Sequence, residues 1–332
     1  MNSIFLNYID LENSSLIDYS NLTSNFLTPQ KEFSSKKKLI FFSQDYSKGI
    51  PICLPYGLKS FNYNDEKYFE LSKKDIAKKI FSLKNQDYIG IKRFVINGLR
   101  FTQYGEPKKK FNSLINKISS YNIQQKERIT KISNNRNTVV AFQTRNFPHF
   151  GHEAIINYLL SKGDYVVVNP LIGPKKSGDA KNELLLESYN FLIDKKYNKR
   201  VLVLPIIANM FYAGAREACH HAILRRNFGF THFCVGRDHA GAENAYNVNS
   251  ASKVTKKLES KLKINIIETQ GAFFCSKCNK SLVRGECNHS EKHLIDISGS
   301  EFRKKLKNKE YYEYADLELQ DLLIKKINLF QD

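Results

Sequence analysis

Apolar runs alternate with helical patterns along the second half of the chain. The runs are TVVAFQ from Thr138, YVVVNP from Tyr165, VLVLPII from Val201, THFCVG from Thr231 and INIIET from Ile264. Helical spacing follows them from Gly151, over 181–195, from about Gly214 and over 252–262. Short β-branched runs separated by helices are typical of a parallel sheet covered on both faces. We therefore predict an α/β fold with a Rossmann-like, five-stranded parallel sheet.

The first 130 residues have a different pattern. The short apolar runs KLIFFSQ and YIGIKRFVINGLRFTQ are broken by Gly, Pro, Asn and lysine-rich turns, which favours a mostly β or mixed domain. Residues 112–137 have helical spacing and end in the polar segment SNNRN. With a prior of about 150 residues per domain, we expect an N-terminal domain over 1–135, an α/β domain over 136–270 and a small C-terminal subdomain over 271–332.

The polar motifs lie where the predicted strands end. QTRNFPHFGH follows the first strand, NPLIGPKKSGD the second, NMFYAGAREA the third and GRDHAG the fourth. In an open parallel sheet, ligands bind beyond the carboxyl ends of the strands, where helix N-termini present free N–H groups. Four strand ends should therefore converge on one site.

The first motif has the chemistry of a polyphosphate site. His149 and His152 are three residues apart, on one side of a starting helix turn, and can stabilise charge on a leaving pyrophosphate. The alternative is a pair of capping or core histidines. Arg145 offers a planar fork for a tetrahedral oxyanion and Gln143 an uncharged donor, although Arg145 could instead be a surface residue paired with a carboxylate.

Together these motifs resemble those of a known family. QTRNFPHFGHEA, NPLIGPKKSGD, YAGAREACHHAILRRNFGFTHFCVGRDHAG and ISGSEFRKKL are similar, in order and spacing, to the signatures of ATP sulfurylases. These sulfate adenylyltransferases convert ATP and sulfate to adenosine 5′-phosphosulfate and pyrophosphate. The segment GIPICLP resembles the one that precedes the catalytic domain in these enzymes, whose first domain has a PUA-like β fold.

The resemblance implies a role for each matching residue. Gln143, Arg145 and the backbone of Ala240 would hold sulfate. ATP phosphates and the leaving pyrophosphate would be held by Asn146, His149, His152 and Arg237, with Thr144 in the catalytic motif and Asp238 and His239 beside the nucleotide. Mg²⁺ would accompany the ATP. Phe147, Ala215 and Ser300 stand where this family commonly has proline, proline and threonine, which puts substrate affinity in more doubt than reaction type.

A cysteine cluster near the end has the spacing of a structural zinc site. Cys275, Cys278 and Cys287 are followed by His289 and His293, and either histidine could complete a tetrahedron, with His289 preferred. The alternatives are free thiols or an oxidation-sensitive pair. Some bacterial and archaeal ATP sulfurylases carry a similar cluster. Cys53, Cys219 and Cys234 lie singly among apolar neighbours and are expected to be buried.

The net charge of +19 invites a nucleic-acid interpretation, but the lysines are scattered and lack the interleaved aromatics of a single-strand groove. We therefore expect no nucleic-acid partner. The chain shows neither a signal-peptide pattern nor a long apolar segment, so we expect a cytoplasmic protein that does not enter the membrane. A homo-oligomer, a dimer or larger, is expected because resembling enzymes commonly oligomerise, and the stripe at Leu322, Leu323, Ile327 and Leu329 could serve it or pack on its own domain.

No attached adenylylsulfate kinase is expected. About 26 residues follow ISGSEFRKKL, and the chain contains no GxxxxGK[ST] loop. The leading hypothesis is thus a kinase-less sulfate adenylyltransferase. The alternatives are a nucleotidyltransferase of the same fold with another acceptor, and a nucleic-acid-binding module.

Overall fold

The computed structural model describes residues 14–28, 46–48, 50, 72–98 and 109–331. Its centre is a five-stranded sheet in the order β4-β2-β1-β6-β7, and every neighbouring pair is parallel. The strands are β1 Val139–Phe142, β2 Tyr165–Val168, β4 Val201–Val203, β6 His232–Val235 and β7 Asn265–Glu268. The predicted parallel sheet is confirmed, and each strand coincides with one of the five apolar runs.

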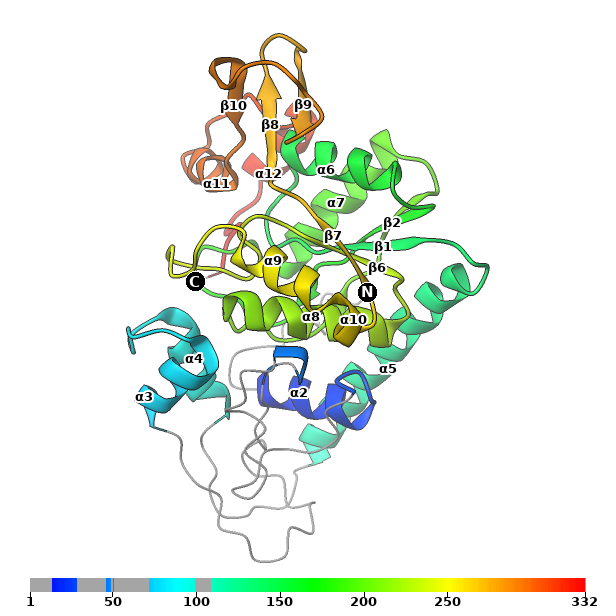
Figure 1. Ribbon diagram of the computed structural model, residues 1–332, viewed down its shortest axis with the longest axis vertical. Coiled ribbons are helices and arrows are strands. Elements are labelled where there is room, and N and C mark those ends of the chain that lie inside the picture. The colour runs from blue at the N-terminus through cyan, green and yellow to red at the C-terminus, as the bar shows by residue number, and fades with distance from the viewer. Residues whose placement is uncertain (1–13, 29–45, 49, 51–71, 99–108, 332) are drawn as a thin grey trace, which may run out of the picture.

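Helices cover both faces of this sheet (Figure 1). They are α6 Phe150–Leu160, α7 Asn182–Lys196, α8 Gly214–Phe228, α9 Ser250–Lys257 and α10 Glu259–Leu262. Alternate residues of β1 face opposite sides: Val140 and Phe142 pack with apolar residues of α6 and α7, whereas Val139 and Ala141 pack with those of α8. β1 therefore needs apolar side chains at every position, which explains its unbroken apolar run.

Two short strands form a separate small sheet beyond the carboxyl ends of β2 and β4. β3 Leu171–Ile172 and β5 Ile206–Ile207 pair in parallel, and each lies a few residues after a strand of the main sheet. β3 lies within the second polar motif, NPLIGPKKSGD, and β5 lies just before the third, NMFYAGAREA. Both motifs then contact the loop after β1, through Asp179 with Arg145 and Met210 with Gln143.

The described residues before β1 are helical. Their elements are α2 Ser14–Thr23, η2 Tyr46–Lys48, α3 Lys73–Asp75, η3 Ile76–Phe81, α4 Ile89–Gly98 and α5 Lys109–Ser133. The run beginning at Tyr88, which we expected in a mostly β or mixed domain, contributes residues 89–98 to α4, because Tyr88, Ile91 and Phe94 recur every three residues and are buried on one side. KLIFFSQ lies outside the described residues, as does GIPICLP apart from Ile50.

The C-terminal region adds a small antiparallel sheet to one end of the α/β unit. Strands β8 Ala272–Cys275, β9 Lys280–Val283 and β10 Leu294–Asp296 pair in the order β10-β8-β9, and β8 and β9 pack on α6. The 3-10 turn η4 Glu291–His293 precedes β10, and the helices α11 Gly299–Lys307 and α12 Leu317–Ile324 follow it. Leu323 and Leu329 are buried in the core that contains α7, so this part of the apolar stripe packs on its own domain, whereas Ile327 is exposed.

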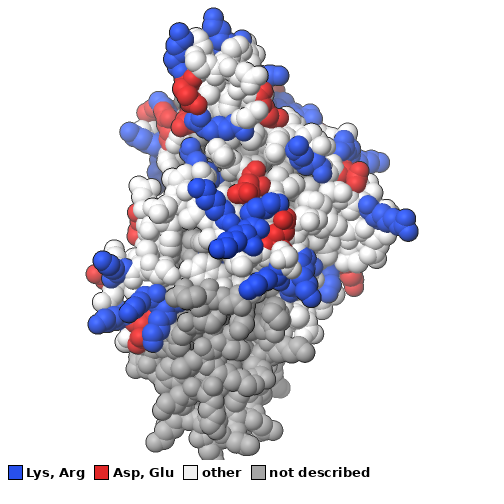
Figure 2. All heavy atoms as spheres, in the orientation of Figure 1, with Lys and Arg blue, Asp and Glu red and all other residues white. Residues whose placement is uncertain are grey.

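Basic residues are spread over the molecule. On the face in Figure 2, lysines and arginines are interspersed with acidic residues over the described surface instead of forming one continuous stripe. None of the helices in the described part of the chain has the length and apolar character needed to cross a membrane.

Candidate active site

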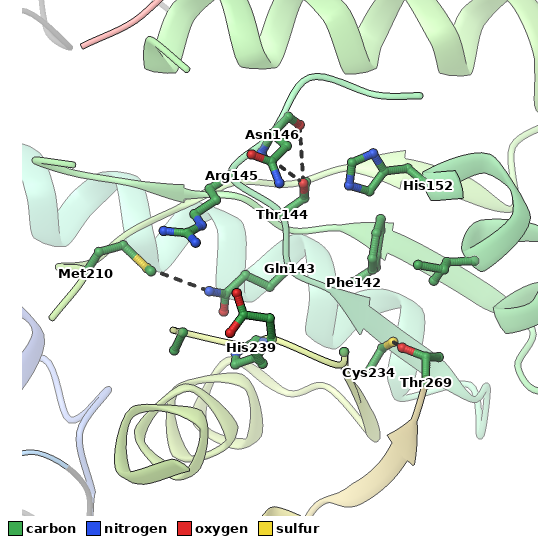
Figure 3. A pocket seen from close by; sticks show the side chains of 14 residues that line it. Phe142, Gln143, Thr144, Arg145, Asn146, His152, Met210, Cys234, His239 and Thr269 are labelled. Carbon is green, nitrogen blue, oxygen red and sulfur yellow. Dashed lines mark hydrogen bonds between the residues drawn. The ribbon is translucent and has the colours of Figure 1, made fainter. Parts of the chain in front are cut away.

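The polar motifs meet around one cavity at the carboxyl ends of the strands. The cavity has a volume of about 210 Å³ (Figure 3). Its lining residues come from β1 and the following loop, α6, the segment before α8, β6 and the following loop, and the end of β7: Phe142, Gln143, Thr144, Arg145, Asn146, His152, Ile155, Met210, Cys234, Gly236, Asp238, His239, Ala240 and Thr269. Of the four motifs predicted to converge, the first, third and fourth line this cavity, and the second reaches it through the contact of Asp179 with Arg145.

His149 and His152 cap the N-terminus of α6. The Gly151 N–H donates to His149 Nδ1 at 3.2 Å, and the His149 N–H donates to His152 Nδ1 at 3.3 Å. Each Nδ1 therefore uses its lone pair, so each neutral ring carries its hydrogen on Nε2. The capping alternative considered from the sequence is observed, and it leaves both Nε2–H groups as donors.

Burial keeps these two imidazoles neutral. It lowers the pKa of His152 to about 3, and it lowers that of His149 well below the ordinary value, with His152 and Arg303 adding to the effect. His152 lines the cavity directly, whereas His149 stacks beside it with ring centroids 3.9 Å apart. Neutral N–H donors at a helix N-terminus suit phosphate oxygens, because they add to the positive helix end without competing for a proton.

Arg145 is held in a buried polar network. Its Nη1 lies 3.5 Å from Asp179 Oδ2, and its Nη2 donates to the Gly241 carbonyl at 2.9 Å. Tyr212 donates to the same carboxylate oxygen at 2.9 Å, and Lys176 lies 3.3 Å from the other oxygen. Burial opposes the charges of both partners, yet their mutual attraction raises the pKa of Arg145 and lowers that of Asp179. The guanidinium is thus a fixed cation at the cavity wall.

Gln143 and Ala240 complete this side of the cavity. The Gln143 Nε2 lies 3.8 Å from the Met210 sulfur, and its buried Oε1 has no hydrogen-bond partner in the described structure. Ala240 is buried and has a φ of 58°, so the GRDHAG loop turns sharply and brings its backbone to the cavity. Asp238, from the same loop, also lines the cavity, and burial raises the pKa of its carboxyl group.

Two predicted site residues do not line this cavity. His149 lies behind His152, and Arg237 points outward with 44% of its side chain exposed, 3.9 Å from Asp296 of β10. Arg237 nevertheless lies in the loop that contributes Gly236, Asp238, His239 and Ala240. It is therefore at the rim of the site.

Sequence reasoning missed Asp179, Tyr212 and Arg303. Asp179 ends the NPLIGPKKSGD motif, Tyr212 opens the YAGAREA pattern, and Arg303 lies in ISGSEFR, so the motifs contained the signal without revealing the contacts. Arg303 of α11 donates to the Asn146 side chain, which brings a second cation to the first motif. Its Nη2 also lies 3.5 Å from the Ser300 hydroxyl.

The cysteine cluster forms a separate group. Cys275, Cys278, Cys287 and His289 place their ligand atoms within 4.8 Å of one another. Both sulfur–sulfur distances from Cys287 are 3.6 Å, and His289 Nδ1 lies 3.3–3.5 Å from the three sulfurs. A tetrahedron with Zn–S bonds of about 2.3 Å has edges of about 3.8 Å, so the donor set fits this metal. His293 lies outside the group and interacts with Ser276.

The remaining cysteine predictions concern packing. Cys219 and Cys234 are buried as expected, and Cys53 lies outside the described residues. Phe147, which replaces a common proline of the family, is buried edge-on against Phe330 at a ring distance of 5.7 Å. This substitution fills the C-terminal core and leaves the polar groups of the site in place.

The chain is similar to known ATP sulfurylases over most of its length. A family model described as ATP-sulfurylase matches residues 120–312. A sulfate adenylyltransferase of Pyrococcus abyssi is 36% identical over 313 residues, which cover 89% of this chain and 81% of that protein. The chain belongs to the ATP-sulfurylase family.

A second relative agrees with this family membership. A sulfate adenylyltransferase of Thermococcus onnurineus is 33% identical over 314 residues, or 89% of this chain and 82% of that protein. Among solved structures, the hexameric APS kinase from Thiobacillus denitrificans is similar with a TM-score of 0.46 and 16% identity, over 60% of this chain and 38% of that chain. The family assigned from the motifs is confirmed.

Proposed function

We propose that this member of the ATP-sulfurylase family is a sulfate adenylyltransferase, which joins ATP and sulfate to give adenosine 5′-phosphosulfate and pyrophosphate. The observation that carries the proposal is the pair of anion-binding groups at one cavity. A capped helix N-terminus with neutral imidazole donors forms one side, and the fixed guanidinium of Arg145 forms the other. Two reacting anions need two such groups within one site.

In this proposal the residues keep the roles that the resemblance implied. Gln143, Arg145 and the Ala240 backbone bind sulfate, and because Gln143 Oε1 has no hydrogen-bond partner in the described structure, the amide can turn its N–H from the Met210 sulfur toward the anion without breaking a bond at that oxygen. ATP phosphates and pyrophosphate are bound by Asn146, His149, His152 and Arg237, with Asp238 and His239 alongside. Thr144 supports the loop, because its hydroxyl accepts from Tyr189 at 3.2 Å.

The reaction requires alignment and charge neutralisation. A sulfate oxygen attacks the α-phosphorus of ATP in line, the bond from that phosphorus to the bridging oxygen breaks, and pyrophosphate leaves with the electron pair. Arg145 orients the nucleophile, and the Nε2–H groups of His149 and His152 stabilise charge on the leaving group. No covalent intermediate on the protein is needed.

Two metals belong to this proposal. Mg²⁺ enters with ATP, bound mainly by phosphate oxygens and water, and neutralises part of the polyphosphate charge. Zn²⁺ would be held by Cys275, Cys278, Cys287 and His289, and these four protein ligands would leave no open position for substrate. Its role is structural.

The proposed organisation has three parts: 1–135, the catalytic unit 136–270 and the metal-bearing segment 271–332. A PUA-like fold for the first part stays a prediction: the described stretches 14–28, 46–48, 50, 72–98 and 109–135 contain helices, and the rest of that part lies outside the described residues. A homo-oligomer that works in the cytoplasm completes the proposal.

The test measures pyrophosphate released from MgATP by the full, zinc-replete chain. Three parallel reactions contain sulfate, molybdate or neither anion. The proposal expects release with sulfate, release with molybdate because it is a tetrahedral dianion of similar shape, and little release without either. Release that ignores both anions would favour the second candidate, a nucleotidyltransferase of this fold with another acceptor.

A further inference from the structure

Three titratable side chains form a row from the interior of α8 to the cavity. Glu217 and His221 are one helical turn apart and fully buried, and His239 of the GRDHAG loop lines the cavity. Glu217 Oε1 lies 3.2 Å from His221 Nε2, and His221 Nδ1 lies 3.0 Å from His239 Nε2. The row thus connects a buried carboxyl group to a ring at the proposed anion site.

The carboxyl end of this row is fixed in place. Glu217 Oε1 accepts from the Phe211 N–H at 2.8 Å, and its Oε2 accepts from the Ala213 N–H at 2.9 Å. The 3.2 Å contact between His221 Nε2 and Glu217 Oε1 is not aligned as a regular hydrogen bond. No other hydrogen-bond partner of this buried nitrogen lies in the described structure, so Glu217 is the group toward which a small rotation of the ring would turn it. The Phe211 and Ala213 N–H groups keep the Glu217 carboxyl group from rotating. A change in its protonation should therefore act on His221 instead of being relieved by rotation of the carboxyl group.

Neutral imidazoles in a row have linked tautomers, because each ring has one N–H and one lone pair. If Glu217 is ionised, His221 donates from Nε2, its Nδ1 accepts from His239, and His239 presents a lone pair at its own Nδ1. If Glu217 is protonated, it donates to His221, His221 donates to His239, and His239 carries its hydrogen on Nδ1. One proton on Glu217 therefore reverses both bonds.

We infer that Glu217, His221 and His239 form a proton-linked relay that sets whether His239 presents a donor or an acceptor toward the anion side of the cavity. The inference rests on the proposed binding of sulfate and ATP there. With Glu217 protonated, His239 becomes an N–H donor and a negative charge near the cavity is removed. Both changes favour an anion.

The surroundings leave Glu217 as the group that responds near neutral pH. Burial raises its pKa to about 7, against the two backbone donors, His220 and Arg145, which lower it. Burial lowers the pKa of His220 to about 3 and that of His221 and His239 well below the usual range, so these rings stay neutral. The other groups whose charges act across this cluster are Tyr88, Arg93, Arg225 and Tyr246.

Lys175 is the neighbouring group that could confuse the test. Burial lowers the pKa of Lys175 to about 8. Lys175 lies in the loop that also holds Asp179, and its Nζ donates to Asn182 Oδ1 at 2.6 Å. Loss of its proton would also weaken anion binding as pH rises. A variant of Glu217 is therefore needed to separate the two groups.

The direct test is ¹⁵N NMR of the histidine rings in the full, zinc-loaded chain without substrates. The signals of His239 are assigned by their absence from His239→Gln. We expect its hydrogen to move from Nε2 at about pH 8 to Nδ1 at about pH 6. A single tautomer over this range would overturn the relay, whether or not the chain turns over sulfate.

The second test follows the KM for sulfate at saturating MgATP. In the unaltered chain it should rise about tenfold between about pH 6 and pH 8, because one proton on the protein is linked to anion binding. Glu217→Gln can turn its amide N–H toward His221, with loss of the bond that Oε1 accepts from the Phe211 N–H, and should hold the KM near its low-pH value throughout. The ionisation of ATP is common to both chains and cancels in the comparison.

His220→Gln is the matched control. His220 is the buried neighbour of His221, but its Nδ1 accepts from the Ile50 N–H at 3.2 Å instead of joining the row. It should preserve the pH dependence of the KM even if it lowers stability. An unchanged pH dependence in a folded Glu217→Gln would overturn the relay. Absence of any sulfate-dependent turnover would instead count against the proposed function, and the NMR titration would still decide the relay.

Discussion

In the proposed function, Arg145 combines its structural contacts with a ligand-binding role. Its contacts with Asp179 and the Gly241 carbonyl use two of its five N–H groups, and the others remain for an anion in the cavity. The ion-pair alternative from the sequence analysis is thus observed, but with a buried carboxylate at the cavity wall. The fork geometry, more than the charge alone, should determine sulfate binding.

Arg145→Lys separates geometry from charge. The lysine keeps a cation near Asp179 but loses the planar fork, so kcat/KM for sulfate should fall about 10- to 100-fold while the KM for ATP changes little. Steady-state kinetics with each substrate varied in turn make the measurement. Lys176→Ala is the control, since Lys176 also pairs with Asp179 but does not line the cavity. An equal loss in both variants would mean that Arg145 acts only through Asp179.

His149 also combines two roles, and a substitution can divide them. Asparagine is among the best N-cap residues, so His149→Asn should retain the cap of α6 and melt close to the unaltered chain. It lacks the imidazole Nε2–H, so kcat should fall about 10- to 100-fold. His149→Ala should lose about 1 kcal/mol of stability in addition. Normal turnover in His149→Asn would show that the ring is only a cap.

At the scale of elements, the small antiparallel sheet supports the helix that carries the histidine pair. A Cβ added to Gly151 would lie 3.5 Å from the Ala272 side chain, so β8 packs directly against the first turn of α6. The group of three cysteines and His289 that could bind zinc lies at the other end of this sheet, where Cys275 ends β8. Loss of the metal should therefore loosen the sheet first and disturb α6 afterwards.

The two candidate histidines give a matched pair for the metal site. His289→Ala should reduce bound zinc and lower the melting temperature by several degrees, at roughly 2–4 °C per kcal/mol, because a structural metal contributes folding energy. His293→Ala should keep the zinc, since His293 lies outside the ligand group. Metal analysis and calorimetry on both proteins decide the matter. Full zinc retention in His289→Ala would refute the assignment.

The alternation of apolar runs with helical spacing explains which elements the sequence could predict. The strands and helices after residue 138 follow from apolar runs and helical spacing, and the strand ends located most of the site. The N-terminal run at Tyr88 could not be assigned to a strand or a helix, because an apolar segment of that length fits either structure until its buried side is known. The partnership of Arg145 with Asp179 could not be read either, because it joins two loops 34 residues apart.

At the scale of the whole molecule, five histidines in the described part of the chain are held neutral. Burial lowers the pKa of each member of this set: His149, His152, His220, His221 and His239. They are neutral in the folded chain but protonate at about 6.5 in the unfolded chain. Their contribution to stability is therefore present above that pH and lost as the pH falls below it.

The melting temperature should accordingly fall between about pH 6.5 and pH 5. Each such histidine costs about 1.4 kcal/mol per pH unit in this window. Glu217 works in the opposite direction, since its raised pKa makes folding less favourable as pH rises from about 4.5 toward 7, but it is one group against five. Thermal unfolding followed by circular dichroism at several pH values measures the balance. A flat or rising melting temperature on acidification would contradict it.

The central claim for the molecule is that sulfate itself attacks ATP at this cavity. Sulfate labelled with ¹⁸O at every oxygen, incubated with MgATP and the full chain, tests it by mass spectrometry of the nucleotide product. The account predicts adenosine 5′-phosphosulfate that retains all of the labelled oxygens, formed together with pyrophosphate. Pyrophosphate accompanied only by unlabelled AMP, or formed equally without sulfate, would contradict it.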